Sequence, residues 1–230
     1  MLELSFIFAG IIAFAVLAYV ILDGFDLGVG ILFPFLASKT ERDVAMNTVA
    51  PVWDGNETWL VLGGGGLLAA FPLAYAIVMP ALYAPTIAML LALVFRGVAF
   101  EFRWRAAEER QWLWDWSFAG GSTVATFAQG VALGALVQGI EVSGRSYAGG
   151  WYDWLSPFSL LTGLALVVGY ALLGSTWLVM RTTGALQERA RSYAWATAVG
   201  TLLLIGIVSL WTPFLQGEYY AKWFVWPTMI

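Results

Sequence analysis

The sequence contains no cysteine and no histidine among its 230 residues. Without cysteine, the chain cannot form disulfide bonds, thiolate metal clusters or covalently attached c-type haem. Without histidine, it has no imidazole to ligate a metal or to act as the base of a catalytic triad. A metal or haem used by this protein must therefore be held by other groups or by another chain.

Charged residues are scarce as well, at 11% of the chain, where a soluble domain has roughly 25%. Hydrophobic residues make up 60%. So few charges cannot coat a water-facing surface, which predicts that much of the surface contacts lipid. The formal net charge is only -4 and no basic block occurs, so nothing indicates nucleic-acid binding. The composition predicts an integral membrane protein.

Apolar stretches long enough to cross a hydrocarbon core of about 30 Å recur along the chain. They predict an all-α fold, a polytopic transmembrane helix bundle of about six spans in a single domain covering residues 1–230. The predicted helices cover residues 4–37, 55–72, 77–100, 117–140, 156–180 and 193–215. The second and third would form a hairpin, because Phe71-Pro72 interrupts an apolar run that has no charge.

The basic residues are divided unevenly between the segments that connect these spans. One set of connections holds Lys39, Arg42, Arg103, Arg105, Arg110, Arg181, Arg189 and Arg191. The other set holds only Arg145 and Lys222. By the positive-inside rule the first set is cytoplasmic, which places the N-terminus outside the cell.

Asp23 and Asp26 interrupt the first apolar run. Their i,i+3 spacing places them on one helix face, and each would cost about 2.5–3.5 kcal/mol at the bilayer centre. Either the span ends at Leu22 and both lie among the headgroups, or they lie within the span and have a function. We favour the second interpretation, because the apolar residues that follow up to Ala37 also need a place in the membrane.

Arg96 is the one basic residue that falls within a predicted span. It could snorkel to the inner interface, since Arg103 follows within two turns. The alternative is a buried cation that faces Asp23, Asp26 or Glu101. A guanidinium stays protonated, so a buried one needs a carboxylate partner.

Asp54 and Glu57 lie at the predicted cytoplasmic start of the second helix. Carboxylates at this position can cap a helix, worth about 0.5–2 kcal/mol. They could instead collect protons at the inner membrane face and pass them inward. The spacing of the two residues does not distinguish these interpretations.

Four consecutive glycines, Gly63, Gly64, Gly65 and Gly66, follow in the same helix. Each costs roughly 1 kcal/mol in helix propensity relative to alanine, so the run needs a compensating contact. Close packing of a neighbouring helix would supply one. The close approach of a flat cofactor, near Trp53 and these glycines, is the other explanation.

Two motifs resemble the second subunit of cytochrome bd-type quinol oxidases: DGFDLGVG at residues 23–30 and PVWDGNETWL at residues 51–60. Weaker matches are FRGV at 95–98, EFR at 101–103 and MRTTG at 180–184. The resemblance runs through the chain in order. The form WDGNETW is similar to the cyanide-insensitive branch of the family.

The resemblance implies a subunit of a terminal oxidase that reduces dioxygen to water with electrons from ubiquinol or menaquinol. In that family the first subunit carries the b-type and d-type haems and the quinol site, so this chain alone would not be catalytic. The residue matching Asp54 would begin a cytoplasmic proton path, continued by Glu57, Asp23 and Asp26. Any flat cofactor near the glycine run would be a haem or quinone of the partner.

The implied location is the cytoplasmic membrane of a prokaryote. Implied partners are the haem-bearing first subunit, membrane lipid, quinol and a small single-helix subunit. Members of the family continue with further helices after the point that matches Ile230, so the chain would be C-terminally incomplete relative to them. Two other functions stay open, a proton-coupled transporter and a purely structural membrane scaffold.

Overall fold

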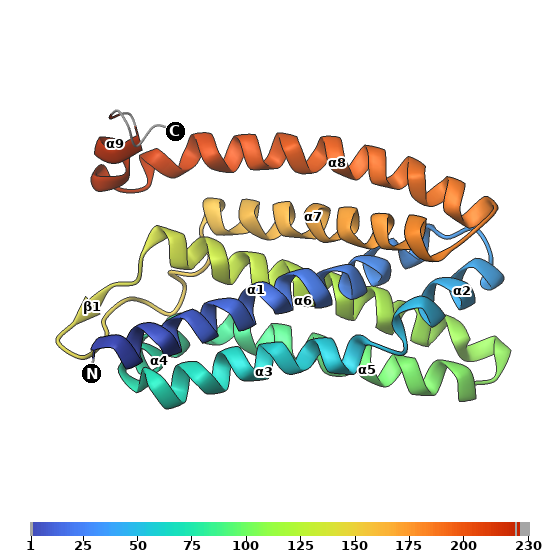
Figure 1. The fold of residues 1–230 in the computed structure, drawn as a ribbon, viewed down its shortest axis with the longest axis horizontal. Coiled ribbons are helices and arrows are strands. Elements are labelled where there is room, and N and C mark those ends of the chain that lie inside the picture. Colours follow the sequence, from blue (N-terminus) through green and yellow to red (C-terminus); the bar gives the residue numbers. More distant parts are fainter. Residues whose placement is uncertain (1, 224, 226–230) are drawn as a thin grey trace.

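The computed structural model describes residues 2–223 and 225 and shows a bundle of long helices (Figure 1). The all-α fold predicted from the sequence is confirmed. The helices are α1 (Leu2–Leu32), α2 (Lys39–Val49), α3 (Trp53–Ala70), α4 (Pro72–Ala81), α5 (Tyr83–Arg105), α6 (Gln111–Gln138), α7 (Pro157–Arg181), α8 (Ala185–Trp211) and α9 (Gly217–Trp223). Short 3-10 turns cover Phe33–Phe35, Glu108–Arg110 and Thr212–Phe214, and a small hairpin pairs β1 (Val142–Ser143) with β2 (Ser146–Tyr147).

Five helices of the described part are long and apolar enough to cross a membrane, where the sequence predicts about six. They are α1, α5, α6, α7 and α8. The helix predicted over 55–72 is present as α3, but it does not meet the same criterion. Its first turns carry Asp54, Asn56 and Glu57, and the glycine run adds little hydrophobicity. Even so, α3 lies along α1 (Figure 1).

The short turn predicted between the helices 55–72 and 77–100 is wrong, because the separate helix α4 (Pro72–Ala81) fills this segment. The chain breaks at Phe71, and α4 begins at Pro72. A second break at Leu82 precedes α5, which has Pro85 in its first turn. Proline lacks an N–H and fits the start of a helix, so both positions favour new helix starts over one continuous helix.

Asp23 and Asp26 lie inside α1, which continues to Leu32. The helix of the first span therefore does not end at Leu22. At about 1.5 Å per residue, the 31 residues of α1 exceed the length needed to cross a bilayer. The helix α8 likewise begins before residue 193, where the prediction placed its start.

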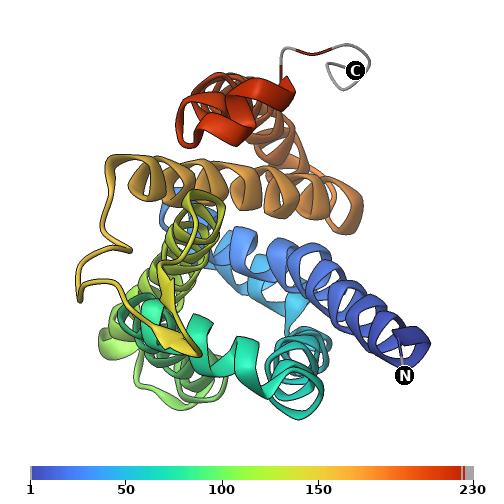
Figure 2. The same cartoon turned by 90° about the vertical axis from the view of Figure 1, so that its left-hand side faces the viewer.

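Figure 2 shows α7 between α8 on one side and the group of α1, α3, α5 and α6 on the other. The main helix contacts are α5 with α6, α6 with α7, α1 with α7 and α3, and α7 with α8. Because α1 touches α3, α6 and α7, its buried face lies at the centre of the bundle.

The closest approach of two helices occurs where α1 crosses α7. A Cβ atom added to Gly28 would lie 1.9 Å from the carbonyl oxygen of Tyr170 and 2.6 Å from the backbone nitrogen of Gly174. The two backbones are thus in direct contact, as small residues allow in membrane helices.

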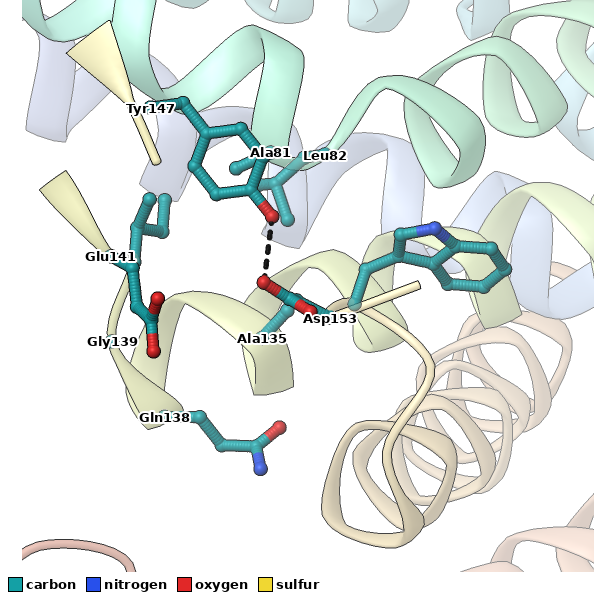
Figure 3. A pocket seen from close by; sticks show the side chains of 10 residues that line it. Ala81, Leu82, Ala135, Gln138, Gly139, Glu141, Tyr147 and Asp153 are labelled. Carbon is teal, nitrogen blue, oxygen red and sulfur yellow. Dashed lines mark hydrogen bonds between the residues drawn. The ribbon is translucent and has the colours of Figure 1, made fainter. Parts of the chain in front are cut away.

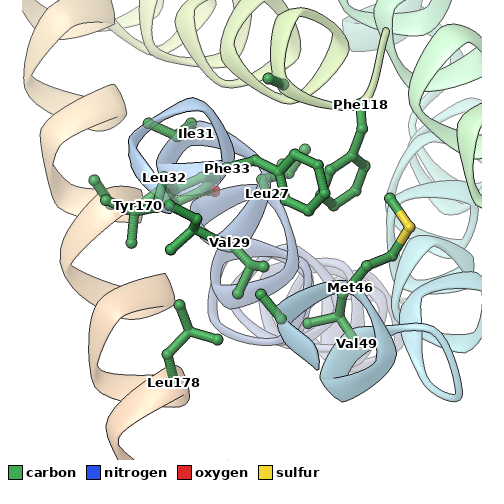
Figure 4. Packing of buried hydrophobic residues seen from close by; sticks show 14 of the residues in the cluster. Leu27, Val29, Ile31, Leu32, Phe33, Met46, Val49, Phe118, Tyr170 and Leu178 are labelled. Atoms are coloured by element: carbon green, nitrogen blue, oxygen red, sulfur yellow. The ribbon is translucent and has the colours of Figure 1, made fainter. Parts of the chain in front are cut away.

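The apolar core lies next to this crossing (Figure 4). It joins the second half of α1 to α2, α5, α6 and α7. Its fully buried members include Leu27, Val29, Phe33, Met46, Val49, Phe118 and Leu178. The core fixes α1 at the level of its two aspartates and so positions the polar groups described next.

Candidate functional site

The two aspartates of α1 are completely buried. Asp23 and Asp26 are both 0% exposed, and their i,i+3 spacing turns them to the same side of the helix. An ionised carboxylate buried without a partner costs several kcal/mol. These side chains therefore require compensating groups from neighbouring helices.

Arg96 of α5 supplies a positive charge beside them. Its side chain is 0% exposed, so the interpretation of Arg96 as a snorkelling residue is wrong. Atom Nη1 lies 3.1 Å from Oδ1 of Asp23 and 2.5 Å from Oε1 of Glu57. Atom Nη2 lies 3.9 Å from Oδ2 of Asp26. We call these four residues the Arg96 cluster; it joins α1, α3 and α5.

Aromatic rings and a close helix contact hold Arg96 in place. The guanidinium carbon lies 5.9 Å from the centroid of the Trp53 ring and 5.8 Å from that of Phe100. These two rings are stacked, with centroids 4.7 Å apart. On the other side, a Cβ added to Gly121 of α6 would lie 2.9 Å from the backbone nitrogen of Arg96. Trp53 therefore packs against α5 and the buried arginine.

Asn56 belongs to this site, although the sequence analysis did not single it out. It is 9% exposed. Its amide nitrogen donates hydrogen bonds to Oδ2 of Asp26 at 2.7 Å and to the carbonyl oxygen of Leu22 at 3.3 Å. The sequence feature that could have predicted its role is its position between Asp54 and Glu57, in a polar run at the start of an apolar helix.

The Arg96 cluster contains three carboxyl groups and one guanidinium. Several of its buried atoms accept or donate no hydrogen bond among the described residues: both oxygens of Asp23, Oδ1 of Asp26, and Nε and Nη2 of Arg96. Buried polar atoms are usually hydrogen-bonded. Three carboxyl groups of the cluster therefore share one guanidinium, with Asp23 held by its ion pair with Arg96.

Asp54 and Glu57 differ in their exposure. The side chain of Glu57 is 23% exposed, and Asp54, one turn earlier on α3, is exposed. Capping by Asp54 is not seen: the N-cap residue of α3 is Val52, and no side chain caps this helix end. Asp54 instead lies in the first turn, where its charge suits the helix dipole.

Glu101 is not a partner of Arg96, contrary to one of the predicted pairings. Its carboxylate lies 3.5 Å from Nη2 of Arg105, and both side chains are largely exposed. The reason is the helical period: five residues along an α-helix turn a side chain by about 140° from the starting direction. Glu101 thus points away from the buried face of α5.

The glycine run is explained only in part. A Cβ on Gly63 would contact Val16, and one on Gly66 would contact Ile12, so these two glycines allow α3 to pack on α1. Gly64 and Gly65 have no neighbour within 4 Å of an added Cβ. Helix packing thus explains half of the run.

A second set of polar groups lies one turn earlier on α1, at Tyr19. Gln129 of α6 donates a hydrogen bond from Nε2 to the hydroxyl of Tyr19 at 2.7 Å. The hydroxyl of Tyr170 on α7 donates to Oε1 of Gln129 at 3.1 Å. Both tyrosines are buried. Since Tyr19 precedes Asp23 by four residues, this chain of hydrogen bonds begins on the same face of α1 as the cluster.

A second buried arginine lies at the end of α5. Arg103 is 1% exposed; its Nε lies 2.5 Å from Oδ1 of Asp115, and its Nη1 lies 2.7 Å from Oδ1 of Asp43. These contacts hold α2 against α5 and α6. From the sequence alone, Arg103 serves only as a marker of membrane topology. Arg103 lies seven residues, or about two helical turns, after Arg96 and so shares its helix face. This spacing could have predicted that Arg103 is buried.

At the opposite end of the bundle, the connection between α6 and α7 lines an open pocket of about 260 Å³ together with the ends of α4 and α6. Figure 3 shows the Tyr147 hydroxyl directed at Asp153, to whose Oδ2 it donates at 2.9 Å. Loss of solvent, and then the nearby Asp153 carboxylate, raise the pKa of Tyr147 to about 12. The neutral hydroxyl and the Gly150 amide, which donates to the same oxygen, hold this loop in shape.

The comparisons with known proteins agree with the resemblance stated from the motifs. The sequence profile described as "Cytochrome bd terminal oxidase subunit II" matches residues 4–230. Cytochrome bd-I ubiquinol oxidase subunit 2 of Escherichia coli (strain K12) is 37% identical in an alignment of 227 residues that covers 95% of this chain and 60% of that protein. Cytochrome bd ubiquinol oxidase subunit 2 of Bacillus subtilis (strain 168) is 37% identical over 188 residues, 80% of this chain and 55% of that protein.

The fold also resembles that of a solved oxidase. A chain of the bd oxidase from Geobacillus thermodenitrificans superposes with a TM-score of 0.69 at 18% sequence identity, covering 93% of this chain and 65% of that chain. This chain spans about 60% of the length of the Escherichia coli relative. With a profile match from residue 4 to residue 230, the chain belongs to the cytochrome bd terminal oxidase subunit II family.

Proposed function

We propose that this chain is the second subunit of a bd-type quinol oxidase and that it provides a proton uptake route from the cytoplasm. One observation carries the proposal. The exposed Asp54 is followed one turn later by the half-buried Glu57, whose carboxylate contacts Arg96 beside the fully buried Asp23 and Asp26. Ionisable groups buried inside a membrane bundle are rare and mark ion or proton pathways.

The direction of the route follows from the predicted topology. With the N-terminus outside, the start of α3 lies at the cytoplasmic face, so Asp54 would take up protons there. Reduction of dioxygen consumes protons, and each electron that reaches a buried centre in low dielectric is stabilised by an accompanying proton. A route that starts at the cytoplasmic face lets turnover build a membrane potential.

The haems of the complex would be held by the partner subunit. This chain has no histidine or cysteine, and its buried Met46 is enclosed by the apolar core. The commonest haem ligands, histidine and cysteine thiolate, are therefore missing from this chain. Quinol, as ubiquinol or menaquinol, would also react at the partner, in the cytoplasmic membrane of a prokaryote.

We therefore expect this chain to bind no haem when it is produced alone. The purified complex should show the visible absorption bands of b-type and d-type haems, whereas this chain, purified in the same detergent, should show none. The measurement is the haem-to-protein ratio from pyridine haemochrome spectra. A stoichiometric haem retained by the isolated chain would refute the assignment of all ligands to the partner.

Replacing Asp54 by asparagine tests the uptake route. Asparagine keeps the size of the side chain but cannot carry the proton. We expect oxygen consumption per haem with excess quinol to fall by about tenfold, equivalent to about 1.4 kcal/mol in the barrier, and its pH dependence to change. Haem content and assembly should stay normal, because Asp54 is exposed and caps nothing.

Glu101→Gln is the matched control for this experiment. It removes another exposed carboxylate, which contacts only Arg105 among the ion pairs of the described chain. Turnover of this variant should equal that of the wild type. Unchanged turnover of Asp54→Asn across a range of pH would rule out Asp54 as the proton acceptor.

The same variants separate this proposal from the two alternatives. A structural scaffold would tolerate Asp54→Asn and Glu57→Gln without loss of turnover. A proton-coupled transporter would acidify or alkalinise proteoliposomes when it is reconstituted without the haem-bearing partner. For the oxidase subunit, we expect proton uptake only in the complex and only during quinol oxidation.

A further inference from the structure

We infer that a phospholipid headgroup binds in a pocket where α1 ends and α6 begins, with its phosphate on Arg42 and its ammonium group on Asp115. The ligand is a zwitterionic glycerophospholipid that carries a primary amine, the chemistry of phosphatidylethanolamine. The site is separate from the proton route and does not depend on it. The pocket has a volume of about 210 Å³ and is lined by Phe33, Pro34, Arg42, Trp112, Asp115 and Trp116.

The pocket lies at the depth where a lipid headgroup is expected. The exposed, charged turn Glu108–Arg110 comes directly before α6. Trp112 and Trp116 follow one turn apart on α6 and are 58% and 62% exposed. Tryptophan side chains favour the boundary between hydrocarbon and headgroups. By the predicted topology, this end of α6 faces the cytoplasmic leaflet.

The two charged side chains of the pocket are held in place by other parts of the protein. Nε of Arg42 lies 3.2 Å from Oδ2 of Asp115, and Nη1 of Arg42 donates to the carbonyl oxygen of Leu36 at 3.2 Å. The other oxygen of Asp115 lies 2.5 Å from Nε of the buried Arg103.

One nitrogen of the Arg42 guanidinium is left for a ligand. Nη2 has no hydrogen-bond or ion-pair partner among the described residues, and the side chain is 27% exposed. Arginine binds phosphate oxygens through short, charge-assisted hydrogen bonds. The Asp115 side chain is 19% exposed, so its carboxylate can also be reached. The pocket therefore presents a cation and an anion side by side.

Charge balance favours a zwitterionic headgroup over an anionic one. Arg42 and Arg103 face Asp43 and Asp115 in one connected set of ion pairs, so the positive and negative charges are equal. An anionic headgroup would add an unbalanced negative charge next to Asp115. In a zwitterionic lipid with an amine, the ammonium contacts this carboxylate while the phosphate contacts Arg42. Sites for anionic lipids instead gather several basic residues, and Arg42 is the single basic residue that lines this pocket.

Apolar surface continues from the pocket in the direction of the acyl chains. The floor is Phe33, which is fully buried and packs edge-on against Phe118. Along α6, Trp116, Gly120 and Val124 follow at intervals of four residues and so share one side of the helix. Gly120 has nothing within 4 Å of an added Cβ, and Val124 is 49% exposed. At about 1.5 Å per residue, this stripe is about 12 Å long, which suits the upper part of an acyl chain.

Native mass spectrometry of the purified oxidase complex tests the site by counting lipids. After stringent washing in detergent, the wild type should retain one more phosphatidylethanolamine molecule than Arg42→Gln or the double variant Trp112→Leu/Trp116→Leu. The double variant leaves every ion pair in place, so it decides the case if Arg42→Gln fails to assemble. Equal lipid retention in the wild type and the double variant would overturn the inference.

Arg191→Gln and Trp195→Leu are the matched controls. Both residues lie on α8 toward the same predicted face of the membrane, and both are exposed, Trp195 at 75%. These variants should retain as much lipid as the wild type. A loss equal to that of the pocket variants would show that exposed arginine and tryptophan hold boundary lipid without any specific site.

Titration of the delipidated complex tests the headgroup. The binding that the double variant lacks should be about tenfold tighter for phosphatidylethanolamine than for phosphatidylglycerol with the same chains, equivalent to about 1.4 kcal/mol. Arg42→Gln should weaken it by about tenfold as well, because a charge-assisted hydrogen bond to the phosphate is lost. Equal affinity for the two lipids would refute the zwitterionic headgroup.

Photo-crosslinking identifies what fills the pocket in the membrane. In the complete complex, Trp112→p-benzoylphenylalanine should give, after illumination, a product of this chain with the added mass of one phospholipid. The same substitution at the exposed Trp195 should give less of this product. A crosslink from position 112 to the haem-bearing subunit in place of lipid would show that a protein segment fills the pocket and would overturn the inference.

Discussion

Replacing Arg96 by leucine should destabilise the assembled protein by roughly 3–5 kcal/mol, the usual cost of leaving buried charged partners without their counterion. The side chain is 0% exposed and contacts three carboxyl groups. Leucine fills part of the volume but provides neither charge nor hydrogen bonds. The measurement is the yield of assembled complex together with its thermal unfolding midpoint in one detergent.

Two further variants distinguish loss of charge from loss of volume. Arg105→Leu removes an arginine of the same helix whose ion pair with Glu101 is largely exposed, and exposed pairs contribute little, so its midpoint should stay near that of the wild type. Combining Arg96→Leu with Asp23→Leu and Asp26→Leu should restore part of the lost stability, because apolar replacements of buried ion pairs are often tolerated. The carboxylate that remains, Glu57, is partly exposed. Assembly of Arg96→Leu at the wild-type level would refute the buried cluster.

The buried positions of Asp23, Asp26 and Arg96 could be predicted because charges inside apolar runs are costly and need a reason. Their partner Glu57 could not be paired with Arg96 from the sequence. Glu101 was a predicted partner of Arg96 and is close to it along the chain. The helical period, however, directs Glu101 away from the buried face of α5, whereas the packing of α3 brings Glu57 to Arg96. Pairing across helices depends on how the helices rotate and tilt, which a single sequence leaves open.

Helix number and boundaries show a similar limit. Long uncharged runs predicted α5, α6, α7 and α8, but several of these helices extend beyond the apolar run through turns that carry charged residues. The separate helix α4 was missed because its sequence is as apolar as that of its neighbours. Its boundaries depend on Pro72 and on the break at Leu82, which are local backbone features without a hydrophobic signal. The ion pairs of Arg103 were missed because a basic residue near a span end is usually a topology marker.

The second large effect should come from the crossing of α1 and α7. Gly28→Ala should destabilise the bundle by about 3 kcal/mol, the upper end of the usual cost of overpacking a tight contact. The added Cβ would lie 1.9 Å from the carbonyl oxygen of Tyr170 and 2.6 Å from the nitrogen of Gly174. Both obstacles are backbone atoms, which no rotamer change can move, so the helices themselves must separate.

Gly10→Ala is the matched control, because it lies on the same helix with nothing within 4 Å of an added Cβ. Alanine favours the helix over glycine by up to about 1 kcal/mol, so this variant should be as stable as the wild type or more stable.

Gly174→Ala should lose as much stability as Gly28→Ala, since its Cβ would lie 2.2 Å from the carbonyl carbon of Gly28. The double variant should lose less than the two single losses combined, because one separation of the helices relieves both clashes. Equal thermal midpoints for Gly28→Ala and Gly10→Ala would show that α1 and α7 do not meet backbone to backbone.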